Sequence, residues 1–133
     1  MNDNNIHFRI LFRSPQYPVI VIEKDDIWPA YNIQELGAIC YNSEPLDDEE
    51  NIKVIDSIGE EFWYRPDQIV LMPGLFRKKW TKKQLIELFD NSETAKENNI
   101  RYKKKSLSNV RVATIVADIC AVLSHDLSLN SDG

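Results

Sequence analysis

The chain has 133 residues and a mass of 15.5 kDa, which corresponds to a single domain (residues 1–133) with one hydrophobic core. Apolar residues make up 43% and charged residues 28% of the sequence, values typical of soluble globular proteins, so a disordered chain, a collagen-like repeat and a disulfide scaffold are excluded. The formal net charge of −5 disfavours a general binder of nucleic acid or of anionic membranes, because such proteins normally carry a basic excess.

The net charge is distributed unevenly along the chain. Residues 1–66 hold 13 acidic and 5 basic side chains, a net −8, whereas residues 67–133 hold 8 acidic and 11 basic side chains, a net +3. Five carboxylates fall within seven residues and three more follow closely after them: Glu44, Asp47, Asp48, Glu49 and Glu50, then Asp56, Glu60 and Glu61. This acidic region is the most distinctive feature of the sequence.

The sequence predicts a cytoplasmic protein that does not enter a membrane. Its first residues lack the positively charged and continuous apolar regions of a secretory signal. The longest apolar stretch, residues 112–123, is too short to span a bilayer and contains Asp118. Cys40 and Cys120 lie far apart in apolar surroundings, so we expect buried free thiols rather than a disulfide.

The first 50 residues predict two strands and a short helix. Residues 6–13 alternate between apolar and polar side chains, which indicates a half-buried strand. Residues 19–22 are continuously apolar and predict a strand buried on both faces, which we expect to pair with the first strand as an antiparallel hairpin. Asn32 and Glu35 fit a capping box at the start of a helix over residues 33–41.

The segment after this helix, residues 43–50, is expected to be a solvated loop because it contains a proline and almost no apolar side chains. Residues 52–56 and 61–65 then predict two strands joined by a turn, and residues 68–72 predict one more. Trp63 and Tyr64 are neighbours in the second of these strands, so they point to opposite faces and one of them is expected at the surface.

The second half of the chain predicts helices. Thr81 and Gln84 fit a second capping box. Apolar residues then recur at helical spacing near the C-terminus, which predicts the main core helix: Val112, Ile115, Val116, Ile119, Cys120, Leu123 and Leu127. The tail 128–133 is expected to be disordered. The sequence therefore predicts an α+β domain with an antiparallel sheet of four to five strands and two to three helices, the long C-terminal helix packed on one face.

No motif in the sequence indicates catalysis, a metal site or a cofactor. His7 and His125 have no partner at a metal-ligand spacing, and the four glycines form no phosphate-binding loop. Cys120 and His125 would lie on different faces of the predicted helix, so they do not form a nucleophile and base pair. We therefore expect no enzyme activity, no metal and no cofactor.

Two surface features allow a binding function. The basic segments 77–83 and 101–105 contain Trp80 and Tyr102 and could contact nucleic acid, although an ordinary solvated surface is the better interpretation. The acidic region is either a loop that aids solubility or a contact for a basic protein partner, and its extension into the hairpin favours the contact. The candidate partner-binding residues are Glu44, Asp47, Asp48, Glu49, Glu50, Glu60, Glu61 and Trp63.

The segment IDSIGEEFWYRPDQIVLMPG, followed by KKWTKKQLIELF, resembles the body of small bacterial immunity proteins, which neutralise toxins of contact-dependent inhibition and related polymorphic systems. The resemblance implies a non-catalytic protein that binds a cognate protein toxin and blocks its active site. Many such toxins are nucleases with basic grooves, which a carboxylate-rich surface would fit. The alternative is a small nucleic-acid-associated regulator that uses segments 77–83 and 101–105. The immunity interpretation also allows a different binding mode, in which segments 77–83 or 101–105 contact an acidic surface of the toxin.

Overall fold

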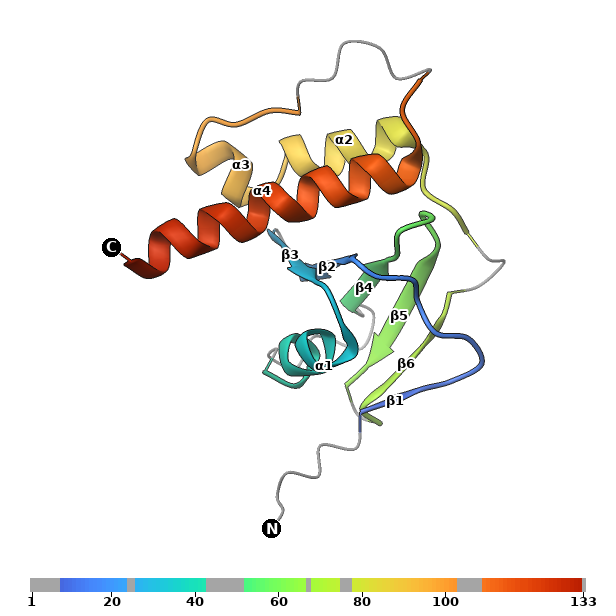
Figure 1. The fold of residues 1–133 in the computed structure, drawn as a ribbon. Coiled ribbons are helices and arrows are strands. Elements are labelled where there is room, and N and C mark those ends of the chain that lie inside the picture. Colours follow the sequence, from blue (N-terminus) through green and yellow to red (C-terminus); the bar gives the residue numbers. More distant parts are fainter. Residues whose placement is uncertain are drawn as a thin grey trace.

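The computed structural model describes residues 8–23, 26–42, 52–66, 68–74, 78–102 and 109–132 (Figure 1). Within these ranges the elements are, in chain order, β1 (Arg9–Ile10), β2 (Val19–Glu23), β3 (Asp26–Ala30), α1 (Ile33–Asn42), β4 (Ile52–Ile55), β5 (Glu61–Arg65), β6 (Val70–Pro73), α2 (Lys82–Asp90), α3 (Glu93–Glu97) and α4 (Val112–Asp132). The α+β class is as predicted, but the described residues form six strands and four helices, more than expected.

The strands form one mixed sheet in the order β1-β6-β5-β4-β2-β3. The predicted hairpin of residues 52–56 and 61–65 is present as antiparallel β4 and β5, in which Lys53 pairs with Trp63 and Val54 with Phe62. β6 continues the antiparallel order next to β5, and only β1 runs parallel to its neighbour. The additional strand β3 contains Trp28 and Pro29, and it occupies the edge of the sheet, the position where a proline is tolerated.

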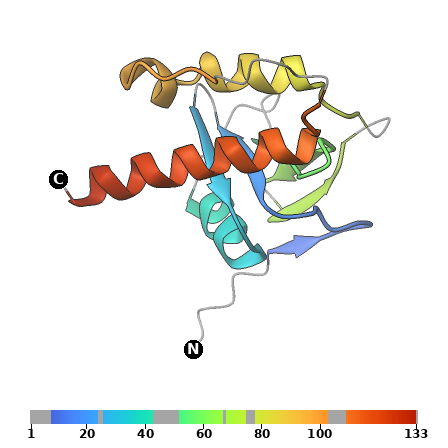
Figure 2. The ribbon, with the colours of Figure 1, turned by 45° about the horizontal axis from the view of Figure 1, so that its top comes forward.

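The helices cover the two faces of the sheet unequally. α2, α3 and α4 lie on one side and α1 lies on the other (Figure 1), and α4 crosses β3 and β2 (Figure 2). On the α4 side, Ile20, Ile55 and Ile119 belong to one buried cluster, and on the α1 side Val21, Leu36 and Phe62 belong to another. The predicted burial of β2 on both faces is therefore confirmed.

The N-terminal strand does not form the predicted hairpin with β2. β1 is only two residues long and pairs in parallel with β6, where Arg9 faces Val70. Phe8 and Ile10 do pack toward the core as their alternation predicts, but Phe12 has a φ of 71° and is 88% exposed. Alternation indicates which side chains are buried but not which strand is the partner, so the sequence pattern could not choose between β2 and β6.

The C-terminal helix is the long core element that the sequence predicts. The predicted positions Ile115, Val116, Ile119, Cys120 and Leu123 are all buried against the sheet and α2. The tail, which was expected to be disordered, continues α4 as far as Asp132, because adding a residue to an existing helix costs far less than starting one. No helix in the described ranges combines the length and the apolar character needed to cross a bilayer.

The two cysteines lie on opposite sides of the sheet. Cys40 belongs to the cluster under α1 and Cys120 to the cluster under α4, so the free thiols expected from the sequence are confirmed. Burial raises the pKa of each thiol to about 12. Both therefore remain protonated and act as small apolar core residues.

Candidate functional site

The predicted acidic surface is only partly within the described structure. Its stretch of five carboxylates, Glu44, Asp47, Asp48, Glu49 and Glu50, lies outside the described residues. Glu60 and Glu61 are 2% and 3% exposed, so the expectation that the hairpin presents these carboxylates to a partner is wrong. Trp63 is half-buried, whereas Tyr64 is buried, as their opposite orientations predict.

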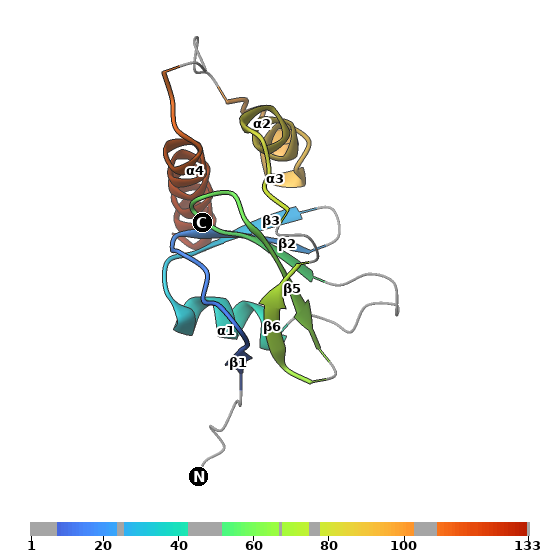
Figure 3. The same ribbon diagram turned by 90° about the vertical axis from the view of Figure 1, so that its right-hand side faces the viewer.

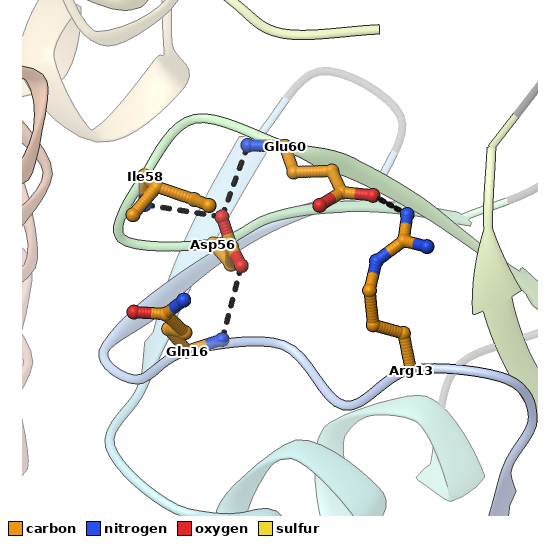
Figure 4. A network of polar contacts seen from close by, with 5 residues as sticks. All are labelled: Arg13, Gln16, Asp56, Ile58 and Glu60. Carbon is orange, nitrogen blue, oxygen red and sulfur yellow. Dashed lines mark hydrogen bonds and ion pairs between the residues drawn. The ribbon is translucent and has the colours of Figure 1, made fainter. Parts of the chain in front are cut away.

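Glu60 and Asp56 are buried because they fix the N-terminal segment to the turn between β4 and β5 (Figure 4). The Asp56 carboxylate accepts hydrogen bonds from the backbone N–H groups of Gln16 at 3.0 Å, Ile58 at 3.1 Å and Glu60 at 3.0 Å. The Glu60 carboxylate accepts a hydrogen bond from the Arg13 guanidinium and forms an ion pair with it. Burial raises the pKa of Asp56, although the backbone donors act in the opposite direction.

The Glu61 side chain points to the opposite face of the sheet from its neighbour Glu60 and binds two indole rings. Its carboxylate accepts the indole N–H of Trp63 at 2.6 Å and that of Trp80 at 2.8 Å, and Lys78 Nζ lies 3.6 Å away. Burial alone would raise the pKa of Glu61, but the two indole donors and the nearby lysines outweigh it, so the pKa is lowered. Glu61 is therefore an ionised structural anchor that fixes the orientation of both rings.

Around Trp63, the side of β4, β5 and β6 that faces away from α1 carries basic and amphipathic side chains. Lys53, Trp63 and Met72 are directly paired across the three strands, and Arg65 follows two residues after Trp63 on the same face. Figure 3 shows α1 on the other side of these strands. α2, α3 and α4 lie on the same side of the sheet as these side chains, where α4 packs on β2 and β3 and α3 packs on β3. We call Lys53, Trp63, Arg65 and Met72 the Trp63 face.

The Trp63 face is rigid at its centre. The Trp63 ring lies against the backbone of Gly74, where a Cβ atom would approach the indole nitrogen to 2.9 Å. Lys53, the cross-strand neighbour of Trp63, and Arg65, two residues along β5, are exposed, while Trp63 and Met72 are half-buried. Two exposed cations are therefore neighbours of a half-exposed aromatic ring that Glu61 and Gly74 hold in position.

Sequence reasoning identified Trp63 but missed the charges around it. The many carboxylates near Lys53 and Arg65 in the sequence suggested a negatively charged surface. Glu60 and Glu61 are buried because they bond to distant partners, Arg13 and Trp80. The alternation within β5 does contain a usable signal, because Arg65 shares the parity of Trp63 and must share its face. The pairing that adds Lys53 follows once the hairpin register is known.

Of the basic segments 77–83 and 101–105, Arg77 and residues 103–105 lie outside the described residues, and the two aromatic side chains of the described parts are less open than the sequence suggested. Lys78 Nζ lies 5.2 Å from the centre of the Trp80 ring, and the Trp80 N–H is bonded to Glu61. The Tyr102 hydroxyl donates to Asp118 at 2.7 Å, and burial together with this carboxylate raises the pKa of Tyr102. Both aromatic rings proposed for stacking are therefore already engaged in contacts within the chain.

The buried acids and thiols are suited to structural roles. Asp56 and Glu61 each accept several hydrogen bonds at the positions described above, and the thiol pKa values of about 12 make Cys40 and Cys120 poor nucleophiles at neutral pH. Across the described ranges, no three His, Cys, Asp or Glu side chains gather closely enough to hold a metal ion.

Comparisons with known proteins establish only the fold. No protein-family model matches the chain, and no curated protein matches it. A solved structure described as the NMR structure of the protein from Shewanella amazonensis superposes with a TM-score of 0.56 at 13% sequence identity. The match covers 84% of this chain and 92% of that one, so the two chains share a fold over most of their lengths.

Proposed function

We propose that this chain is a non-catalytic, cytoplasmic immunity protein that binds a cognate bacterial toxin and blocks its active site. The observation that carries the proposal is the Trp63 face, where a half-exposed, rigidly held tryptophan has two exposed cations as its neighbours in the sheet. The composition of this face supports the proposal, since tryptophan, arginine and methionine are all enriched at protein interfaces.

The rigidity of the Trp63 face supports tight binding. Trp63 is fixed by its hydrogen bond to Glu61 and by its packing on Gly74, so little side-chain entropy is lost when a partner covers it. Lys53 and Arg65 are exposed and would attract an acidic surface on the partner, which increases the association rate. The docking mode is thus one in which basic residues of this chain meet acidic residues of the toxin.

The acidic stretch at residues 44–50 keeps a separate role in the proposal. It joins α1 to β4 and ends shortly before Lys53, so it is connected to the Trp63 face by the chain itself. A nuclease is the toxin class that such a stretch fits best, because its substrate groove is basic. The Trp63 face would supply the docking surface and the acidic stretch would supply the charges that enter the groove.

The experiment is a capture of the partner from lysate of the organism that encodes the chain, with mass spectrometry and a toxicity assay of the captured protein. The test variant is K53E/R65E, and the matched control is K83E/R111E, which changes the net charge equally at exposed positions on the helical side. We expect the wild type and the control to capture a protein that is toxic when expressed alone. Capture by K53E/R65E at the wild-type level would refute the proposed docking surface.

A second candidate function, nucleic-acid binding, is favoured by the same pairing of Trp63 with Lys53 and Arg65. An aromatic ring with cations as its neighbours on a sheet face can stack on the bases of a single strand while the cations contact phosphates. An electrophoretic titration against single-stranded RNA and duplex DNA at moderate salt separates the candidates. Retardation at micromolar protein that K53E/R65E abolishes would support this function over the immunity function.

A further inference from the structure

A cleft separates α2 and α3 from the neighbouring part of the sheet, on the α4 side of the molecule. Its volume is about 670 Å³, and its lining includes residues of β2, β3, α2 and α3. This volume is within the range of sites that hold a drug-sized molecule or a few peptide residues. None of the four residues of the Trp63 face lines the cleft, but the cleft borders that face: Ile22 of its lining pairs with Lys53 across β2 and β4, and the Trp80 N–H shares the Glu61 carboxylate with Trp63.

The cleft combines an apolar lining with a negative rim. Ile22, Trp80 and Leu88 are half-buried and supply apolar surface, and the Trp80 ring is held in place by its hydrogen bond to Glu61. Among the described residues of its lining, the carboxylates are those of Asp26, Glu87 and Glu93, and the cation is Lys96. The apolar surface can accept a large side chain, and the carboxylates surround it.

The carboxylates of the cleft are available for a cationic ligand. Asp26 is fixed by the Thr94 hydroxyl at 3.1 Å and by the Ile27 N–H at 2.9 Å, both of which are neutral donors. Within the described ranges, no Lys or Arg nitrogen lies within 4 Å of the carboxylates of Asp26, Glu87 or Glu93. A cation that enters the cleft therefore need not displace an existing ion pair with a described residue.

We propose that this cleft binds a short basic segment of another protein, with one large apolar side chain inserted against Trp80 and Leu88 and a neighbouring Lys or Arg paired with the carboxylates. The occupant follows from charge complementarity: three carboxylates and one lysine leave the lining with a net negative charge. The cleft borders the Trp63 face at Lys53, but its lining contains none of the four residues of that face, so this inference does not depend on the proposed function.

The test begins with selection from a random dodecapeptide library displayed on phage, with the full chain as the target. We expect the enriched peptides to contain a large apolar residue within two positions of a Lys or Arg. The best of them is then synthesised and titrated calorimetrically against the wild type and three variants. E87K places a cation in the cleft, E97K makes the same charge change at an exposed α3 position outside it, and R65E alters the Trp63 face without changing Lys53, the neighbour of Ile22.

The proposal predicts that E87K weakens peptide binding about tenfold or more, whereas E97K and R65E keep the wild-type affinity within about twofold. It is overturned if no peptide is enriched, if the enriched peptides are neutral or acidic, or if E87K and E97K behave alike. Loss of binding in R65E would place the peptide on the Trp63 face and would also overturn it. A wild-type dimer that E87K dissociates would show that a second copy of the chain occupies the cleft instead.

Discussion

Replacing Glu61 by glutamine should lower the free energy of unfolding by about 2 kcal/mol at pH 7. The Glu61 carboxylate gives each of its two oxygens to a different indole N–H, at 2.6 Å for Trp63 and 2.8 Å for Trp80. A glutamine oxygen can serve one of these donors, but the amide NH₂ group then faces the other donor. The variant loses one charge-assisted hydrogen bond, which is worth roughly 1.5–3 kcal/mol.

The effect of the substitution should depend on pH. The folded-state pKa of Glu61 is lowered from its ordinary value of 4.5, so the unfolded chain takes up the proton first as the pH falls. The contribution of Glu61 is therefore complete above that value and is lost as the pH falls through the folded pKa. The stability difference between wild type and E61Q should be constant from pH 7 to about pH 5 and should shrink at lower pH.

The assay is urea unfolding followed by far-UV circular dichroism at pH 7, 5, 4 and 3. E97Q is the matched control, because Glu97 is an exposed α3 carboxylate and its replacement should change stability by less than about 0.5 kcal/mol. If E61Q were as stable as E97Q at pH 7, the structural role of Glu61 would be refuted. A deficit that did not change with pH would refute the lowered pKa.

Three further substitutions or reactions test the rest of the fold. Gly59→Ala should cost about 1–2 kcal/mol in thermal unfolding, because Gly59 has a φ of 87° and an added Cβ would approach the Trp80 carbonyl to 3.1 Å; an unchanged melting temperature would contradict this. Leu123→Ala should cost about 2–5 kcal/mol by urea unfolding, because it empties a buried position in α4, and a loss below 1 kcal/mol would contradict the assigned packing. Cys40 and Cys120 should resist an aromatic disulfide reagent at pH 8 until urea is added, and rapid labelling of the native chain would show that one thiol is exposed.

The sequence correctly predicted the elements that depend on residues close to one another along the chain. The capping box at Thr81 and Gln84 is present, with Gln84 N–H donating to Thr81 Oγ1 and Thr81 N–H donating to Gln84 Oε1. The β4 and β5 hairpin and the apolar stripe of α4 also follow from spacing alone. The partner of β1 could not be predicted, since Phe8 and Ile10 would be buried in either orientation.

The short elements were missed because their own signals are weak. β3 contains Pro29, which argues against a central strand but is compatible with the sheet edge that β3 occupies. α3 has only five residues, and its N-cap is Ser92, whose hydroxyl accepts a hydrogen bond from the Ala95 N–H at 3.2 Å. Such a helix is stable only because Ala95 packs into the core, which sequence spacing does not reveal.

The sequence predicted that Trp63 belongs to the candidate site, but it predicted a negative charge around Trp63 where the structure has a positive one. Glu60 and Glu61 read as surface carboxylates because the sequence places them in an acidic region, yet Arg13 and Trp80 bind them from 47 and 19 residues away. Contacts over such distances depend on the tertiary fold. Once these carboxylates are buried, the exposed charges of the hairpin are those of Lys53 and Arg65, so the hairpin presents positive rather than negative charge.

The measurement that tests the central claim most directly is the dissociation constant of the captured protein partner for the wild type and for Trp63→Ala. A half-buried tryptophan at the centre of a docking surface should act as a hot spot worth at least about 2 kcal/mol, or roughly a 30-fold loss of affinity. Circular dichroism of the variant confirms that it is folded before the titration. A folded Trp63→Ala variant that binds the partner with the affinity of the wild type would contradict the claim that the Trp63 face is the docking surface.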